Sequence, residues 1–128
     1  MYAHAEYLKT RVFTATPGEL VVMLYDALFQ RIRQAIMCLE DREFARAGEL
    51  LGNGQDIITE LMSALRPEEA PELSQNLLDL YGFSKQRLLE GYGTKNAAIL
   101  EEVVRVLQPL RDAFDEAERQ LRARRAET

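Results

Sequence analysis

The stretch TATPGELVVMLYDALFQRI, residues 14–32, decides the fold of this chain, because it starts a helix and shows how much that helix must bury. Thr16 can cap the helix, Pro17 suits the first helical position, and Glu19 can reach back to the Thr16 amide to complete a capping box. The apolar residues that follow recur at the three- and four-residue spacing of one helix face. We therefore predict a helix over residues 17–40.

The same spacing continues along nearly the whole chain, and no run of residues alternates with the two-residue period of a strand. Two turn signals interrupt the pattern, RPEEAP and GYGTKN. We therefore predict an all-α fold, an antiparallel up-down four-helix bundle with short connections and an N-terminal arm. The expected helices cover residues 17–40, 43–66, 71–90 and 96–122.

We expect residues 1–128 to form a single domain, because this length supports one core and no linker or repeat divides it. Residues 1–15 are set apart as the arm, since their apolar pattern does not fix how they pack. The bundle and the arm together account for the whole chain.

Three local features are expected to affect where the helices begin and how regular they are. Asp41 is the predicted cap of the second helix. The same helix contains three glycines, each costing about 1 kcal/mol relative to alanine, so we predict one helix with a weak middle. Pro109 lies inside the last helix and is expected to bend it, because its ring displaces the carbonyl four residues earlier. The three glycines are Gly48, Gly52 and Gly54.

The composition argues against catalysis and metal binding. His4 and Cys38 are the only histidine and the only cysteine, so the sequence offers no disulfide, no cysteine-based zinc site and no histidine cluster. No serine or cysteine nucleophile has a plausible histidine base. We predict that the protein is not an enzyme and that it uses no cofactor and no metal.

Charge and hydropathy limit the classes of partner that we expect. The net charge of −5 argues against a nucleic-acid binder, which would carry a concentrated basic surface. The one basic run, RQLRARR at residues 119–125, is interpreted as a helix end that complements the helix dipole, with a phosphate-binding tail as the alternative. No apolar stretch approaches the roughly 20 residues of a membrane span, and the start lacks the apolar run of a signal peptide. We expect a cytoplasmic protein without membrane insertion.

The first and third helices are more apolar than a bundle core requires. Two explanations remain open: the arm or a second copy of the chain covers the surplus, or the surplus forms a groove for a partner helix. On the third helix the apolar residues are Leu73, Leu77, Leu78, Leu80, Tyr81, Phe83, Leu88, Leu89 and Tyr92, and the first helix adds Val21, Val22, Tyr25, Phe29 and Ile36 to its core stripe.

Two motifs carry a resemblance to a known family. YLKTRVFTATPGELVVMLYDALF, residues 7–29, resembles the opening of the flagellar export chaperone FliS family, where a tyrosine precedes T-A-S/T-P-x-E/Q-L and an apolar run ending in L-Y/F-D. NLLDLYGF, residues 76–83, is similar to the family pattern N-L-x-x-L-Y followed by an apolar position. DIITEL and ILEEVVRVLQPLRDAF follow in the expected order, so the resemblance covers nearly the whole chain. The sequence departs from the family at Ala27, Gly91-Tyr92 and Phe114.

The resemblance implies a cytosolic export chaperone that binds the disordered C-terminal region of flagellin and prevents its premature polymerisation. The client would become helical along the chaperone surface. Other flagellar export or regulatory proteins remain open as partners. The alternative is a structural helical bundle whose surplus apolar face forms a homodimer or adaptor interface.

The same resemblance implies a set of partner-binding residues. Tyr7 and Leu8 would belong to an arm that lies over the bundle and moves when the client binds, or to a fixed lid. Asn76 would bond the client backbone or fill a polar gap in the bundle. For the remaining residues, groove contact and ordinary core packing both stay open. These residues are Met23, Tyr25, Leu77, Leu80 and Tyr81.

Overall fold

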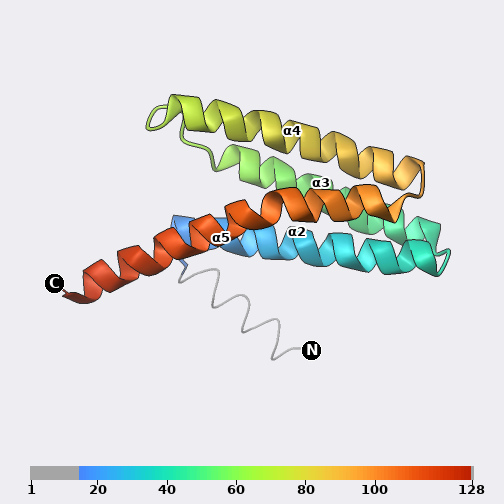
Figure 1. Cartoon of the computed structure of the whole chain (residues 1–128), viewed down its shortest axis with the longest axis horizontal. Coiled ribbons are helices and arrows are strands. Elements are labelled where there is room, and N and C mark those ends of the chain that lie inside the picture. Colours follow the sequence, from blue (N-terminus) through green and yellow to red (C-terminus); the bar gives the residue numbers. More distant parts are fainter. Residues whose placement is uncertain (1–14, 128) are drawn as a thin grey trace.

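The structure is a computed structural model that describes residues 15–127, and these residues form four helices and no strand (Figure 1). The helices are α2 (Pro17–Glu40), α3 (Phe44–Ser63), α4 (Pro71–Gly93) and α5 (Ala97–Glu127). Each helix runs back alongside the one before it, and α5 also packs on α2, which closes the bundle. The predicted all-α, up-down four-helix bundle is confirmed. The predicted arm lies, apart from Ala15, outside the described residues.

The start of α2 has the predicted capping box. The Glu19 amide donates to the Thr16 hydroxyl at 3.2 Å, and the Thr16 amide donates to a Glu19 carboxylate oxygen at 3.4 Å. Pro17 occupies the first turn, where its missing N–H costs nothing. Local sequence chemistry therefore sets where the bundle begins.

The predicted cap of α3 is wrong. Asp41 ends α2 instead, with its amide donating to the carbonyls of Met37 and Leu39. Arg42 has a φ of 62°, and this left-handed residue reverses the chain before α3 can start. Glu43 precedes α3 and makes no side-chain cap hydrogen bond.

The other helix ends also move from the predicted positions. α3 ends at Ser63, earlier than expected. α4 runs to Gly93, because the expected glycine stop remains helical and Lys95, with a φ of 51°, makes the reversal instead. α5 continues to Glu127, since its arginines and alanines favour a helix even without packing.

The glycine-rich middle of α3 is helical throughout, as predicted, and two of its glycines lie against side chains of other helices. A β-carbon added to Gly54 would lie 3.3 Å from a Leu28 methyl. One added to Gly48 would lie 2.9 Å from the Tyr92 hydroxyl oxygen, which donates to the Phe44 carbonyl at 3.1 Å. These glycines let neighbouring helices approach closely.

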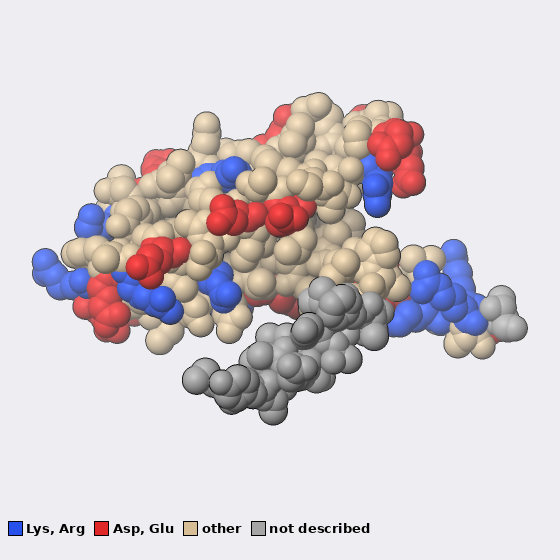
Figure 2. Space-filling model, turned by 180° about the vertical axis from the view of Figure 1, so that it is seen from behind, with Lys and Arg blue, Asp and Glu red and all other residues tan. Residues whose placement is uncertain are grey.

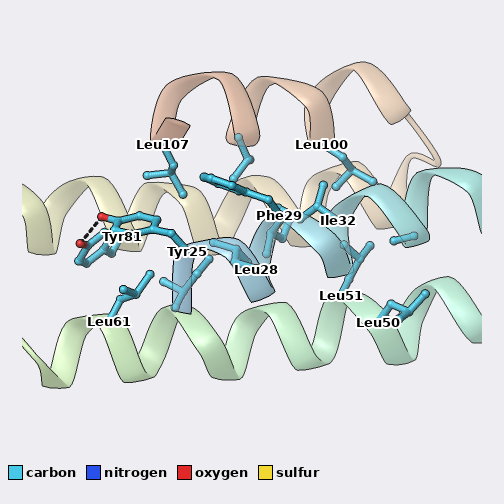
Figure 3. Packing of buried hydrophobic residues seen from close by; sticks show 14 of the residues in the cluster. Tyr25, Leu28, Phe29, Ile32, Leu50, Leu51, Leu61, Tyr81, Leu100 and Leu107 are labelled. Carbon is cyan, nitrogen blue, oxygen red and sulfur yellow. Dashed lines mark hydrogen bonds between the residues drawn. The ribbon is translucent and has the colours of Figure 1, made fainter. Parts of the chain in front are cut away.

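The core is built around α2. This helix packs against both α3 and α5, and these two contacts are the most extensive in the bundle. Tyr25, Leu28, Phe29 and Ile32 are almost fully buried there (Figure 3). Much of the extra apolar width of α2 therefore serves two neighbouring helices: of its predicted surplus residues, Val22, Tyr25 and Phe29 are buried, whereas Val21 and Ile36 are half-buried and line surface hollows.

The last helix passes through Pro109 without a break in helical structure. Its first part lies in the bundle, and its C-terminal part extends beyond the other helices (Figure 1). The bend near Pro109 stays a prediction. None of the described helices is both long enough and apolar enough to span a membrane.

Candidate partner-binding surface

α4 is the helix that leaves apolar side chains uncovered. Leu73 is 56 % exposed and Leu89 is 64 % exposed, and Leu78 and Phe83 also reach solvent. α4 contacts α3 and α5 less extensively than α2 does. The predicted surplus of apolar surface on the third helix is therefore present on the described bundle.

One end of the seam between α4 and α5 is closed. A β-carbon added to Gly91 would lie 2.6 Å from a Leu100 methyl carbon, so only glycine fits there without a shift of Leu100. Nearby, the Arg87 guanidinium bonds the Glu102 carboxylate at 2.7 Å. These contacts hold the C-terminal part of α4 against the N-terminal part of α5.

The other end of the seam is open and apolar. Leu73 and Leu77 of α4 face α5 there across a groove. Alanines at two of its α5 positions keep the groove wide, because their side chains are short. Its α5 wall consists of Leu110, Ala113, Phe114 and Ala117.

A second hollow joins this groove and extends it to the end of α3. Leu73, Leu77 and Phe114 line both hollows, so they form one continuous apolar surface. We call this surface the apolar cleft. Its α3 side adds Leu61, Ala64, Leu65 and Arg66, the connecting turn adds Glu69 and Ala70, and its floor adds Val21, Ser74 and Tyr81.

Two tyrosines support the floor of the cleft. The hydroxyls of Tyr25 and Tyr81 share a buried hydrogen bond of 2.5 Å, which links α2 to α4 across the bundle (Figure 3). The Tyr25 ring also lies 6.1 Å from that of Phe114, between centroids. Burial raises the pKa of Tyr25, and its hydrogen bond to Tyr81 raises it further. Burial likewise raises the pKa of Tyr81, so both hydroxyls stay neutral.

The α5 wall of the cleft is fixed by its attachment to α2. The buried Glu118 carboxylate accepts a hydrogen bond from the Thr16 hydroxyl at 3.0 Å. It lies so close to Gly18 that a β-carbon there would overlap with the Glu118 carboxylate. Arg122 also pairs with Glu19 at 3.1 Å. Because α5 stays with α2 at this end, it separates from α4, and the cleft opens.

The predicted partner-binding residues fall into different places. Tyr25 and Tyr81 are 0 % and 1 % exposed, so both belong to the core; Tyr81 also lines the floor of the cleft, and Tyr25 lies beneath it. Leu77 is buried but lines the cleft, whereas Leu80 is half-buried and Asn76 is exposed. Contact between any of them and a partner stays a prediction.

The remaining predicted residues lie away from the cleft or outside the described chain. Met23 is half-buried in a separate, polar hollow beside Glu19 and Arg119. Tyr7 and Leu8 fall outside the described residues. Of the predicted set, the structure therefore places Leu77 and Tyr81 at the cleft, leaves Asn76 and Leu80 outside its lining, and separates Met23 from it.

The sequence-based prediction missed the α5 wall of the cleft. Phe114, which the sequence marked only as a departure from the family pattern, is half-buried and lines the groove. Ala113 and Ala117 were not among the predicted partner-binding residues, although alanines four residues apart mark a helix face that can accept a neighbour. This spacing was the available signal, because both alanines face the groove.

No group of three or more histidine, cysteine, aspartate or glutamate side chains between residues 15 and 127 is placed to hold a metal ion. Carboxylates such as Glu68 and Glu101 are exposed. What the described surface offers is apolar area for binding.

Comparisons with known proteins find relatives that share most of this sequence. The family model described as flagellar protein FliS matches residues 1–121. The flagellar secretion chaperone FliS of Bacillus subtilis is 33 % identical over 114 residues, covering 89 % of this chain and 84 % of the relative. FliS of Escherichia coli is 29 % identical over 111 residues, covering 86 % and 82 %. FliSB of Pseudomonas aeruginosa is 30 % identical over 108 residues, covering 84 % and 86 %.

Proposed function

The chain belongs to the FliS family of flagellar secretion chaperones, and from this premise we propose that it binds the C-terminal region of flagellin before export. The bound segment is thereby kept from polymerising prematurely. The protein acts by binding alone, without catalysis, and it works in the cytoplasm. The observation that carries the proposal is the apolar cleft between α4 and α5.

The cleft suits a helix as its occupant. Leu73, Asn76, Leu80 and Phe83 follow one another on α4 at three- and four-residue spacing, which places them along one edge of the helix. An amphipathic client helix laid beside this edge would bury its apolar side against the cleft. A client region that is disordered when free loses entropy on binding, so it needs a large apolar contact in return.

The predicted partner-binding residues have distinct roles in this proposal. Leu77 contacts the client through the cleft, Leu80 contacts it farther along the same helix, and the exposed Asn76 bonds the client backbone. Tyr25 and Tyr81 act from below, because their hydrogen bond holds the floor of the cleft in place. These two tyrosines are positioning residues.

The N-terminal part of the chain completes the proposal. Tyr7 and Leu8 belong to an arm that lies over the bundle and moves when the client binds. Met23, which lies near the start of α2, lines a separate hollow and would contact the client outside the cleft.

Titration with a labelled peptide tests the proposal. The peptide covers the C-terminal region of flagellin encoded by the same genome, and its fluorescence anisotropy reports binding. We expect saturable binding to the full chain. Leu73→Asp should weaken it at least about tenfold, because burying an unpaired carboxylate against apolar side chains costs more than 1.4 kcal/mol.

Met37→Asp is the matched control. Met37 is 62 % exposed on α2 and lies outside the cleft, so this variant should bind the peptide within about twofold of the wild type. Absence of binding by the wild-type chain would refute the proposed function. If both variants weakened peptide binding equally, the cleft would not be the binding site.

A further inference from the structure

The open end of the cleft is flanked by charges of opposite sign. The connection from α3 into α4 carries Glu68, Glu69 and Glu72, together with Arg66, and Glu69 and Arg66 line the cleft. The end of α5, residues 119–127, carries four arginines and one glutamate, all exposed. Figure 2 shows acidic side chains gathered on one projection at this end of the molecule, with a basic side chain beside them, and basic side chains gathered on the other projection, with a gap between the two.

The basic side continues the wall of the cleft. Ala113 and Ala117 line the groove, and Leu121 and Arg124 follow at further steps of four and three residues, on the same face of α5. Leu121 is 41 % exposed. The apolar wall therefore runs on to an arginine at the open end.

Two other arginines of this segment are held in ion pairs. Arg119 pairs with Asp115 at 3.0 Å, and Arg122 pairs with Glu19 of α2 at 3.1 Å. These contacts hold the two guanidinium groups away from the cleft. Arg124 follows Ala117 by seven residues, about two full turns, which places it on the cleft side of α5.

We propose that the cleft selects a client helix with carboxylates along the edge that meets the end of α5, and with lysine or arginine along the edge that meets the α3–α4 turn. The proposal rests on the proposed function, because the helix is a segment of the protein client. Its apolar face contacts Leu73, Leu77 and Phe114, while Arg124 and Glu69 face its two charged edges.

This arrangement fixes how the client lies in the cleft. Turning the helix end to end exchanges its two edges and brings like charges together, so the apolar contacts are available in both orientations but the charge contacts in only one. Charge pairs at the rim of an interface contribute mainly to orientation and specificity. A nucleic acid or an anionic lipid surface is a poorer occupant, since the carboxylates on the acidic side repel both.

Charge reversal at the basic side tests the proposal, with the flagellin C-terminal peptide as the probe and the full chain as the protein. Arg124→Glu should weaken binding about three- to fivefold at low salt, which is the range of an exposed ion pair. The effect should shrink to less than about twofold in 1 M NaCl, where the screening length is about 3 Å. Arg105→Glu is the matched control, since Arg105 is exposed on α5 outside the cleft and changes the net charge equally; it should change the affinity less than about twofold.

The acidic side is tested in the same way. Glu69→Lys should weaken binding by a similar factor at low salt, and Glu60→Lys, at an exposed position of α3, is its control. A peptide in which the carboxylates are replaced by lysine should bind Arg124→Glu better than it binds the wild type. A structural effect of Arg124→Glu would not produce this exchange of preference.

Each remaining outcome decides against the proposal in a distinguishable way. If the wild type binds the peptide and Arg124→Glu and Glu69→Lys match their controls, the charge selection is refuted while the proposed function stands. If the wild type does not bind the peptide, both are refuted. If sedimentation shows a dimer that Arg124→Glu dissociates, a second copy of the chain occupies the cleft, and the proposal is again wrong.

Discussion

α2 and α4 are both apolar around much of their circumference, yet their apolar side chains differ in how far they are buried. α2 lies between α3 and α5, and its Tyr25, Leu28 and Phe29 are nearly fully buried. α4 has the same two neighbours but contacts them less extensively, and its Leu73 and Leu89 remain exposed. Apolar content alone therefore does not tell a core helix from a binding helix; the closeness of its neighbours does.

Truncating one leucine in each helix tests most directly whether α2 and α4 are packed differently. Leu28→Ala should lower the free energy of unfolding by about 3 kcal/mol, because it leaves a cavity where the side chain is 0 % exposed. Leu89→Ala should change it by less than about 0.5 kcal/mol, since that side chain is 64 % exposed. Urea unfolding followed by circular dichroism measures both, and similar losses would show that α4 is as well packed as α2.

The hydrogen bond between Tyr25 and Tyr81 tests how strongly α2 and α4 depend on each other. Tyr25→Phe and Tyr81→Phe should each lower the free energy of unfolding by about 1–2 kcal/mol, because each leaves the other buried hydroxyl without its partner. The double variant should lose less than the sum of the two single losses. Simple additivity in urea unfolding would mean that the two hydroxyls do not depend on each other.

The same pair predicts a pH dependence. The folded chain holds the pKa of both tyrosines above their ordinary value of 10.0, mainly through burial. The neutral form is therefore favoured in the folded state, and its contribution to stability is complete below pH 10 and declines as the pH rises further. The wild type should lose more stability than Tyr25→Phe/Tyr81→Phe between pH 9 and pH 11, and equal losses would contradict this.

Two glycines on α4 test where this helix is tightly packed. Gly91→Ala should destabilise the chain by about 1 kcal/mol, because the displacement of Leu100 outweighs the gain in helix propensity. Gly82→Ala should stabilise it by about 0.5–1 kcal/mol, since a β-carbon there meets nothing within 4 Å. Thermal unfolding compares the two, and a stabilising Gly91→Ala would show that the closed end of the α4–α5 seam is loose.

The features that the sequence predicted are the local ones. The Thr16 capping box depends on residues three apart, and helical spacing of apolar residues was enough for four helices. The α3 cap was missed because the reversal at Arg42 depends on backbone conformation rather than on residue type. The cleft was only partly predicted, since Phe114 and Ala117 face it only because α5 follows α2 away from α4.

The smallest expected change in stability comes from deleting the residues before Thr14. The bundle should stay folded with nearly unchanged helicity, because α2 keeps its capping box and its buried face. If the arm covers apolar surface of α4, the deletion uncovers that surface, and binding of a hydrophobic dye should rise.

Tyr7→Ala in the full chain then separates the two roles of the arm. It should weaken binding of the flagellin peptide if Tyr7 contacts the client, and strengthen it if Tyr7 only competes with the client for the cleft. Either result would mean that the arm acts at the exposed surface of α4 rather than in the core around α2. Unchanged dye binding after the deletion, together with unchanged peptide affinity in both variants, would exclude the arm from the mechanism and leave the exposed leucines of α4 accessible to the client from the start.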